Sequence, residues 1–375
     1  MNPTIAAEAA QQIPSTANLR VSEFTPLPAP SALAAELPLT EAVGAVVERG
    51  RDQVRAIMDG LDDRLLVIVG PCSIHDPKAG LEYARRLVSA AERHKEDLLI
   101  VMRAYFEKPR TTVGWKGLIN DPHLDGSHDV ATGLRMAREF LHRVAALGMP
   151  VGTEFLEPIS PQYTADLVTW GAIGARTTES QIHRQLSSGL SMPIGFKNGT
   201  DGDLQVALDA CSASSAAQSF LGIDGDGRAA LVATAGNPDT HLILRGGRKG
   251  PNYGADDVAA ASAKLAASGL NPRLIVDASH ANSGKSHHRQ AEVALEIGAQ
   301  LEAGGPSTAA IAGVMLESFL MGGAQSLDVA DVAAGTAELA YGQSVTDGCM
   351  EWDVTTTVLD HLARSARVRR ERARG

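Results

Sequence analysis

The segment RLIVDASH at residues 273–280 runs from an uninterrupted apolar stretch directly into the polar residues Asp277, Ser279 and His280. Aliphatic residues without apolar–polar alternation are typical of a strand that is buried on both faces, as in a parallel sheet covered by helices. In barrels built from such strands, binding and catalytic groups lie just beyond the carboxyl ends of the strands. The segment therefore predicts a parallel strand that ends at a functional site, with His280 in a position suited to chemistry.

The residues that follow, ANSGKSHH at 281–288, allow other interpretations. The tripeptide GKS at 284–286 looks like the end of a phosphate-binding loop. That loop needs a first glycine at the position where this chain has Ser279, so the pattern fails. We therefore expect an ordinary turn at Gly284-Lys285, and we expect His287 and His288 to be solvated.

Seven further apolar runs resemble this one, and most are separated by amphipathic stretches such as GLEYARRLVSAAERH (80–94). Eight strands that alternate with helices over about 250 residues favour an eight-stranded barrel over a six-stranded open sheet. The sequence thus predicts an α/β protein with a (β/α)8 TIM barrel. The other runs are LLVIV (65–69), LLIVM (98–102), MPVGTEF (149–155), GAIGA (171–175), MPIGF (192–196), HLILR (241–245) and IAGVML (311–316).

Composition excludes several other classes of protein. The chain has 375 residues, 44% of them hydrophobic, which suffices for a large core, yet it contains no apolar stretch long enough to span a membrane. Three scattered cysteines and the lack of a signal peptide predict a cytoplasmic protein with reduced thiols. The net charge of −10 argues against nucleic-acid binding. We expect the arginine-rich tail at 363–375 to be frayed and solvated.

The ends of the eight predicted strands carry a consistent set of side chains. A polar or metal-capable residue follows or closes every run, which chance would rarely produce, and the barrel fold would bring all of them to one rim. We interpret this set as an active-site ring. Its members are Cys72, Arg103, Glu154, Arg176, Lys197, Arg245, Asp277 with His280, and Glu317.

Cations dominate this ring although the protein as a whole is acidic. Arginine forks and lysine suit phosphates and carboxylates, and so many cations imply more than one anionic group, such as two phosphorylated substrates. The alternative is that they form structural ion pairs with carboxylates of the barrel. The cations are Arg103, Arg176, Lys197 and Arg245, joined by Lys108 and Arg110 of the loop FEKPRTTVGWKG (106–117).

The remaining ring members suggest a metal site. Cys72, His280 and Glu317 are joined by Asp347 of the later segment SVTDGCMEW (344–352). One thiolate, one imidazole and two carboxylates suit Mn, Fe, Co or Zn better than Mg or Ca. The spacing of these residues forms no known signature, and Cys72 alone could equally be a small buried core residue.

Long motifs in the chain resemble one enzyme family, the type I 3-deoxy-D-arabino-heptulosonate 7-phosphate (DAHP) synthases. The resemblance runs from about Asn18 to Arg370. It rests on GPCSIHDP (70–77), RAYFEKPRTTVGWKGLINDP (103–122), GAIGARTTESQIHRQLSSGLSMPIGFKNGTDG (171–202), LRGG (244–247), SHANSGK (279–285), GVMLES (313–318) and SVTDGC (344–349).

The resemblance implies roles for individual residues. The metal ligands of the family match Cys72, His280, Glu317 and Asp347, and its erythrose 4-phosphate contacts match Arg110 and Thr111. Lys108 and His280 would take part in catalysis, Lys108 by protonating the new alkoxide or by steering a carboxylate. The family's phosphoenolpyruvate contacts match Arg103, Lys108, Ala175, Arg176, Lys197 and Arg245.

The implied activity is the condensation of phosphoenolpyruvate with erythrose 4-phosphate, the first step of the shikimate pathway, with one divalent metal ion. Three alternative functions were considered beside this activity. A sister synthase would use arabinose 5-phosphate, but the KPRTT stretch (108–112) resembles the erythrose-using group. A metal-dependent aldolase would not need the second group of cations. A non-catalytic regulatory barrel would be expected to have lost some of the ring residues.

Feedback-inhibited members of this family carry an N-terminal extension and an insertion between the fifth and sixth strands. Residues 1–62 would form the extension, 63–375 the barrel, and 198–240 a β-rich regulatory insertion. The alternative is that both additions only build the interface of a homodimer or homotetramer. Glycine at position 222 favours tyrosine over phenylalanine as the inhibitor, since it leaves room for a phenolic hydroxyl. The implied inhibitor pocket comprises Gln162, Leu186, Leu190, Ser191, Phe220 and Gly222.

Overall fold

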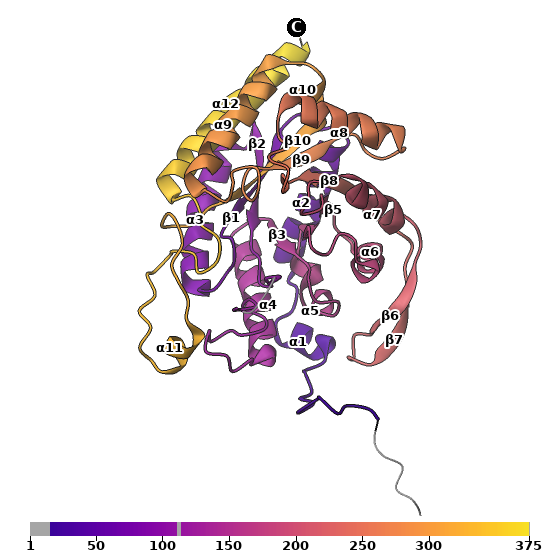
Figure 1. The fold of residues 1–375 in the computed structure, drawn as a ribbon, viewed down its shortest axis with the longest axis vertical. Helices are drawn as coiled ribbons and strands as arrows, with labels where there is room; N and C mark the ends of the chain where they lie inside the picture. The colour runs from indigo at the N-terminus through magenta and orange to yellow at the C-terminus, as the bar shows by residue number, and fades with distance from the viewer. Residues whose placement is uncertain (1–15, 111–113, 375) are drawn as a thin grey trace, which may run out of the picture.

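The computed structural model describes residues 16–110 and 114–374. Within them a closed barrel of parallel strands has the order β1-β10-β9-β8-β5-β4-β3-β2, so the predicted eight-stranded barrel is confirmed (Figure 1). Every residue of these strands is buried, which explains why the runs are apolar without alternation. The strands are β1 (Leu65–Gly70), β2 (Leu98–Arg103), β3 (Val151–Glu154), β4 (Trp170–Ile173), β5 (Ile194–Lys197), β8 (Thr240–Leu244), β9 (Leu274–Asp277) and β10 (Ile311–Glu317).

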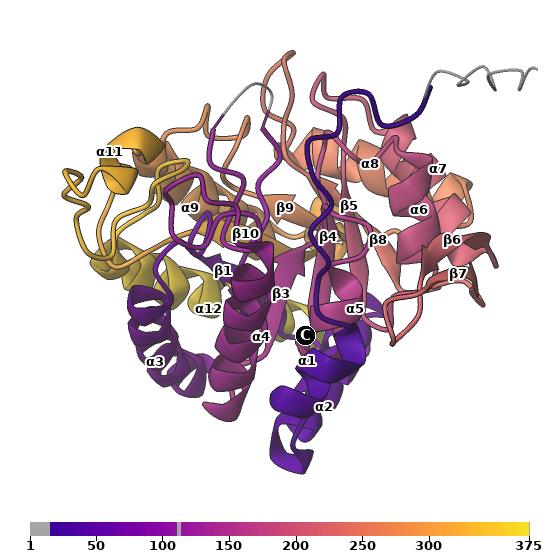
Figure 2. The ribbon, with the colours of Figure 1, turned by 90° about the horizontal axis from the view of Figure 1, so that it is seen from below.

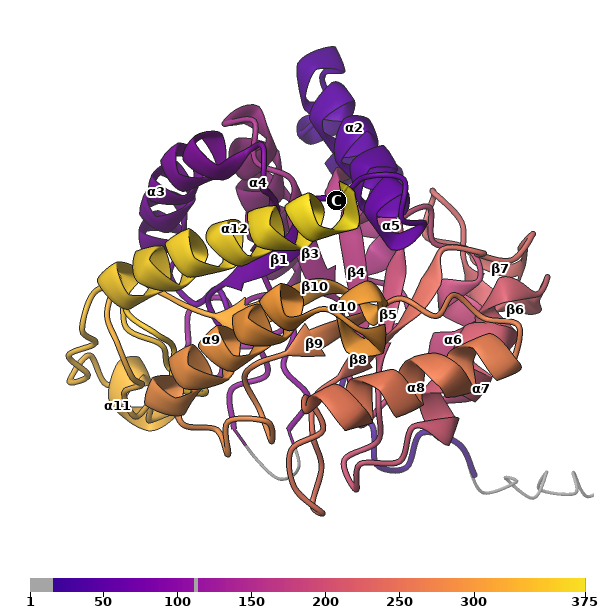
Figure 3. The same cartoon turned by 90° about the horizontal axis from the view of Figure 1, so that it is seen from above.

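Helices surround the strands of the barrel (Figure 3). Each amphipathic stretch buries one stripe, such as Leu81, Ala84 and Leu87 of α3. Asp76 and Asp129 begin α3 and α4 by accepting hydrogen bonds from backbone N–H groups of the first turn. The helices are α3 (Pro77–His94), α4 (Val130–Ala146), α5 (Pro161–Thr164), α6 (Gln181–Ser187), α7 (Gln205–Ser215), α8 (Ala255–Ala267), α9 (His287–Ala303), α10 (Pro306–Ala310) and α12 (Trp352–Arg374), with the short α11 (Val329–Ala333) in the loop before α12.

The described part of the N-terminal segment is packed against the barrel. Helix α2 (Glu41–Met58) contributes Val54, Ile57 and Met58 to the cluster of side chains that fills the barrel interior. The short α1 (Pro30–Glu36) packs near α5. Helix α2 therefore closes the amino-terminal end of the barrel and is part of its core.

Residues 198–240 combine a helix with a β-hairpin. Helix α7 is the ordinary helix that follows β5 in the barrel repeat, so the added element is the antiparallel pair β6 (Ser219–Ile223) and β7 (Ala229–Ala233). The hairpin lies outside the barrel, on the side of α6 and α7 (Figures 1 and 2). Its turn touches the N-terminal segment, where the Ser31 N–H donates to the Gly225 carbonyl at 2.8 Å.

The prediction of a frayed basic tail is wrong, whereas the expected exposure is met in part, by Arg367, Arg372 and Arg374. Helix α12 continues to Arg374 and lies alongside α9. Arg367 and Arg370 form ion pairs with Asp97, and Arg370 also pairs with Asp63. These aspartates lie about 270 to 307 residues away in the sequence, so a local pattern could not reveal them.

In the described residues, no helix is long and apolar enough to cross a membrane.

Candidate active site

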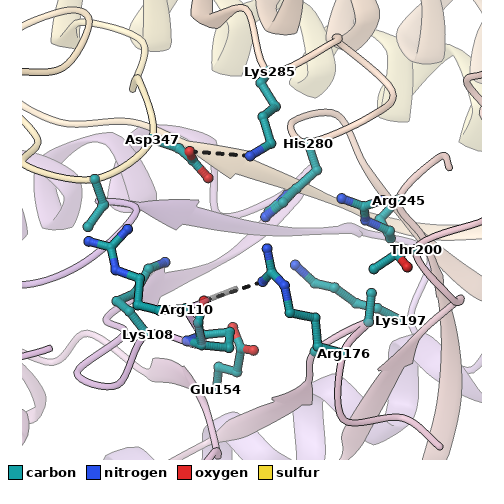
Figure 4. A pocket seen from close by; sticks show the side chains of 14 residues that line it. Lys108, Arg110, Glu154, Arg176, Lys197, Thr200, Arg245, His280, Lys285 and Asp347 are labelled. Carbon is teal, nitrogen blue, oxygen red and sulfur yellow. Dashed lines mark hydrogen bonds and ion pairs between the residues drawn. The ribbon is translucent and has the colours of Figure 1, made fainter. Parts of the chain in front are cut away.

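A cavity of about 280 Å³ opens at the carboxyl ends of the barrel strands (Figure 4). Most of the residues predicted for the active site line it, and most of the charged side chains around it are cations. Figure 4 shows Arg176, Lys197 and His280 converging on its centre. Its lining residues are Lys108, Pro109, Arg110, Glu154, Gly174, Ala175, Arg176, Lys197, Thr200, Arg245, His280, Lys285, Thr346 and Asp347.

Three of the predicted metal ligands come together beside this cavity. One ligand atom each from Cys72, Glu317 and Asp347 lies within 4.8 Å of the other two. His280 is outside this group, but its Nε2 is 4.0 Å from the Glu317 carboxylate. The mixture of thiol and carboxylate oxygens, with imidazole nearby, fits a divalent ion such as Mn, Fe, Co or Zn.

Arg103 lies beneath the cavity and does not line it. Its guanidinium pairs with Glu317 at 2.8 Å, donates to the carbonyls of Pro71 and Cys72, and stacks 3.5 Å from the centre of the Tyr105 ring. Burial would raise the pKa of Glu317, but the positive charge of Arg103 is the largest opposing effect, and the pKa lies below its usual value. Arg103 therefore keeps Glu317 ionised and orients it toward Cys72 and His280.

Lys108 connects the cavity to the buried thiol. Its ammonium group lies 3.2 Å from the Cys72 Sγ and donates to the Cys72 carbonyl at 2.9 Å. Burial would lower the pKa of Lys108, but Cys72 and Glu317 raise it above its usual value, so the group is protonated at neutral pH. Burial raises the pKa of the Cys72 thiol, and the nearby Glu317 carboxylate adds to that effect.

Asp277 organises a second group of buried side chains, on the opposite side of the floor of the cavity. Its carboxylate lies 3.0 Å from the Lys197 ammonium and 2.9 Å from the Nδ1 of His280, and accepts a hydrogen bond from the Ser279 hydroxyl at 2.5 Å. Burial opposes ionisation, but His280 and Lys197 hold the pKa of Asp277 well below its usual value. A proton on the Nδ1 of His280 would face Asp277, which leaves the Nε2 lone pair directed at Glu317.

Two further cations of the cavity have no carboxylate partner. In the described part of the chain, neither Arg176 nor Arg245 forms an ion pair; their side chains reach only backbone carbonyls at 3.4 Å. Buried Asn198 positions Arg245 by accepting from its backbone N–H at 2.8 Å and by donating to the Gly246 carbonyl. Burial lowers the pKa of Arg245, which indicates a cation that an anionic ligand would stabilise.

The loop after β9 brings an unpredicted residue into the site. Asn282 anchors this loop by donating to the carbonyls of Asp277 and Leu244. His280 and Lys285 adopt left-handed backbone conformations, with φ of 52° and 63°. Lys285 thereby lines the cavity, 3.6 Å from the Asp347 carboxylate. The expectation of an ordinary turn missed this lysine, because its direction depends on two unusual backbone angles that no local pattern predicts.

Other residues differ from the sequence analysis in smaller ways. Thr200 and Thr346 line the cavity and were not predicted, whereas Glu154 and Asp277 were recognised as strand ends but given no role. Ala175 lines the cavity as expected, and Thr111 lies outside the described residues. His288 is exposed, but His287 at the start of α9 is half-buried and stacks on it, so the expectation that both are solvated is only partly met.

The residues predicted to bind an inhibitor lie away from this cavity, around α5, α6 and β6 on one side of the barrel (Figure 2). Gln162 and Ser191 are exposed, Leu186 is buried, and Leu190 is half-buried. The last two, Phe220 and Gly222, lie on the half-buried face of the hairpin.

The N-terminal segment reaches the same region. The Tyr163 hydroxyl of α5 donates to the Pro28 carbonyl at 2.8 Å, and the hairpin turn contacts Ser31. Segments that are far apart in the sequence therefore meet beside the expected inhibitor residues.

The comparisons with known proteins agree on the family that this chain resembles. Residues 39–360 match the model of the DAHP synthetase I family. Phospho-2-dehydro-3-deoxyheptonate aldolase of Corynebacterium glutamicum is 56% identical over 96% of this chain and 97% of its own length. The structure of phospho-2-dehydro-3-deoxyheptonate aldolase from Francisella tularensis superposes with a TM-score of 0.88 at 45% identity, over 93% of this chain and 99% of that one.

Further relatives carry names that refer to amino acids. The Phe-sensitive enzyme of Escherichia coli is 50% identical over 94% of this chain and 98% of its own length. The Tyr-sensitive enzyme of Salmonella typhimurium is 50% identical over 92% of this chain and 94% of its own length.

Proposed function

The chain belongs to the DAHP synthetase I family, and from this membership and the geometry of the cavity we propose that it condenses phosphoenolpyruvate with D-erythrose 4-phosphate. The products are 3-deoxy-D-arabino-heptulosonate 7-phosphate and inorganic phosphate, and the reaction is the first step of the shikimate pathway. The observation that carries the proposal is a cavity with six lysines and arginines, four of which form no ion pair with a carboxylate of the described chain, beside a buried thiol–carboxylate cluster. Relatives named as heptonate enzymes favour this activity over the use of arabinose 5-phosphate.

The cations divide into two subsites in this proposal. Arg176, Lys197 and Arg245 lie on one side of the cavity and would bind the phosphate and carboxylate of phosphoenolpyruvate. Arg110 lies on the other side, in the loop after β2, and would bind the phosphate of erythrose 4-phosphate together with Thr111. Arg103 would act indirectly, by holding Glu317 and the Cys72 carbonyl beneath the substrates.

A divalent ion would be held by Cys72, His280, Glu317 and Asp347. The convergence of three donor atoms and the direction of the His280 Nε2 support this set. When bound there, the ion supplies Lewis-acid polarisation of the aldehyde oxygen. Lys108, which contacts the Cys72 sulfur, and Lys285, which pairs with Asp347, would then be free to bind the anionic groups of the substrates.

The residues of the chain account for the remaining steps. Arg176, Lys197 and Arg245 orient phosphoenolpyruvate so that its C3 faces the aldehyde carbon, which removes much of the entropic cost of the encounter. As the C–C bond forms, Lys108 donates a proton to the new alkoxide. Water adds at the electron-poor C2, and the resulting hemiketal phosphate loses inorganic phosphate. Asp277 fixes Lys197 and His280 throughout.

A phosphate-release assay tests the proposed function. The purified protein is expected to release phosphate only when both substrates are present, to lose this activity on exhaustive chelation, and to regain it with Mn²⁺. Arabinose 5-phosphate in place of erythrose 4-phosphate is the matched control. Phosphate release that favours arabinose 5-phosphate, or that survives chelation, would contradict the proposal.

Arg176→Ala tests the division into subsites. The variant is expected to raise the KM for phosphoenolpyruvate by about 10- to 100-fold, the loss expected for one charge-assisted hydrogen bond, and to change the KM for erythrose 4-phosphate much less. Arg110→Ala is the matched control and should show the opposite pattern. Equal changes in both KM values for Arg176→Ala would show that the subsites are wrongly assigned.

We also propose that an aromatic amino acid inhibits the enzyme at Gln162, Leu186, Leu190, Ser191, Phe220 and Gly222. Leu186, Leu190 and Phe220 offer apolar surface to an aromatic ring, and the contacts of the hairpin with α6 and the N-terminal segment could transmit binding to the barrel. These contacts fit an assembly role equally well, and the two roles are compatible in a homodimer or homotetramer.

Tyrosine is expected to inhibit more strongly than phenylalanine. A Cβ at Gly222 would lie 2.8 Å from the Val232 side chain, so glycine keeps this face of the hairpin open. Gly222→Ser should therefore reduce the inhibition by tyrosine in steady-state assays. Gly225→Ser is the matched control, because a Cβ at that turn would meet no atom of the described chain within 4 Å. If neither amino acid inhibits at millimolar concentration, only the assembly role remains.

A further inference from the structure

A second cavity, of about 350 Å³, lies at the opposite, amino-terminal end of the barrel. Its walls come from the segment before β1, from the residues just before β9 and β10, and from the ends of α9 and α12. Helices α9 and α12 run side by side toward this end, beside α10 (Figure 1). Its volume is in the range of small-molecule sites. None of the residues around it takes part in the reaction proposed above.

Two largely buried arginines of this cavity lack a counter-charge. Arg273 donates from one Nη to the Ala309 carbonyl at 3.1 Å, while its Nε is buried with no hydrogen-bond partner in residues 16–110 and 114–374. Arg369 donates only to backbone carbonyls, those of Ile311, Asp63 and Arg64. Across these same ranges neither guanidinium forms an ion pair. Buried cations are normally paired, so this arrangement is costly as it stands.

The carboxylates at this cavity are already engaged by other arginines. Asp62 is paired with Arg64, and Asp63 is paired with Arg370 at 2.7 Å and with Arg374 at 3.1 Å. Neither aspartate forms an ion pair with Arg273 or Arg369, although the charge of Asp63 acts favourably on Arg369 from a longer distance. In agreement, burial lowers the pKa of both guanidinium groups, and the charge of Arg273 contributes to lowering the pKa of Arg369 to about 10.

Apart from Thr308 and Arg372, the rest of the cavity wall is small and apolar. Leu301, Ala309 and Ala373 line it, and a Cβ added at Gly305 would meet no atom of the described chain within 4 Å. A fully hydrated inorganic ion would leave this surface unused. A ligand that combines an anionic group with an apolar body would match both parts of the wall.

We propose that this cavity binds a small organic carboxylate with an apolar body. The carboxylate occupies the space between Arg273 and Arg369 and accepts hydrogen bonds from the Arg273 guanidinium. The apolar body lies against the exposed side chains of Ala309 and Ala373. Binding supplies the direct ion-pair partner that Arg273 and Arg369 lack among the described residues.

Calorimetric titration with 4-bromobenzoate tests this site, using the full chain with saturating phosphoenolpyruvate so that the active-site cations are occupied. We expect one site per chain in the parent protein. Arg273→Met should weaken binding at least about 10-fold, the loss expected for a charge-assisted contact. Arg372→Met is the matched control at the same cavity, because its Nη1 already donates to the Ala303 carbonyl at 3.2 Å on an exposed helix end, and it should bind the probe as the parent does.

A crystal grown with 4-bromobenzoate gives an independent readout, since the anomalous signal of bromine locates the probe. Bromine beside Ala309 and Ala373 supports the proposal, and bromine only at the catalytic cavity or beside Leu186 and Phe220 overturns it. Absence of binding by the parent, or equal binding by Arg273→Met, overturns it as well. If Arg273→Met does not fold, Arg273→Lys keeps the charge without the planar fork and should still weaken binding.

A purely structural role for Arg273 predicts a different result. In that case the variants would lose thermal stability, and the probe would not change the unfolding temperature of either protein. The proposal instead predicts that the probe raises the unfolding temperature of the parent and leaves that of Arg273→Met unchanged.

Discussion

Cys72→Ser is expected to weaken the binding of Mn²⁺ by about 100-fold or more while leaving the fold intact. Changes to groups that only orient metal ligands typically cost about 10- to 100-fold, so loss of the ligand atom itself should cost at least the upper part of that range. Cys72 is fully buried and its thiol lies in the cluster with Glu317 and Asp347. A serine hydroxyl fits the same space but has a far higher pKa than a thiol, so it is a poor anionic ligand.

Cys349→Ser is the matched control for this measurement. Cys349 is also fully buried, and its sulfur accepts a hydrogen bond from the Cys72 backbone N–H at 3.3 Å, but it does not belong to the cluster of ligand atoms. Metal affinity is measured by competition with a chelating indicator, and thermal unfolding without metal reports on the fold. Equal affinities of Cys72→Ser and the parent would show that Cys72 is only a core residue.

The sequence was sufficient to predict the barrel because the information about each strand is local. A run such as LLVIV at 65–69 is apolar throughout because β1 is buried on both faces, and its position before Cys72 follows from the strand ending at the rim. The same logic placed Arg176, Lys197, Arg245 and His280 at one cavity. Repetition of one strand–helix unit made both the fold and the rim predictable.

Features that depend on contacts between distant segments were not predictable in this way. The tail appeared to be a solvated basic run because its partners Asp63 and Asp97 precede it by hundreds of residues. The burial of Arg103 beneath the cavity follows from its pairing with Glu317, which is 214 residues away. Lys285 enters the site through a positive φ that sequence patterns rarely reveal for lysine.

Asp277 shows what strand-end reasoning leaves out. The sequence identified it as the last residue of its strand, but nothing local indicated that one carboxylate would hold a lysine from β5 and a histidine from its own loop. Its side chain does not line the cavity, so its effect on substrates must pass through Lys197 and His280. It is a positioning residue, and its removal should affect both partners at once.

Asp277→Asn is therefore expected to lower kcat/KM by about 100-fold or more. It should also destabilise the protein by about 3–5 kcal/mol, the cost of removing one partner of a buried ion pair. The amide keeps the shape of the carboxylate but leaves the Lys197 ammonium buried without a counter-charge. It also removes the negative charge that favours a proton on the Nδ1 of His280, so the Nε2 lone pair is no longer held toward Glu317.

Ser279→Ala provides the control, because it removes the hydroxyl that donates to Asp277 and lies 2.7 Å from the His280 Nδ1, but leaves both ion pairs of Asp277 in place. It should cost about 1 kcal/mol of stability and little activity. Urea unfolding gives the stability of each variant, and the KM for phosphoenolpyruvate and the affinity for Mn²⁺ separate the two partners of Asp277. A rise in KM reports on Lys197, whereas weaker Mn²⁺ binding reports on His280. If Asp277→Asn changes stability but neither of these quantities, the carboxylate supports only the fold, and the organisation of the site must come from other groups.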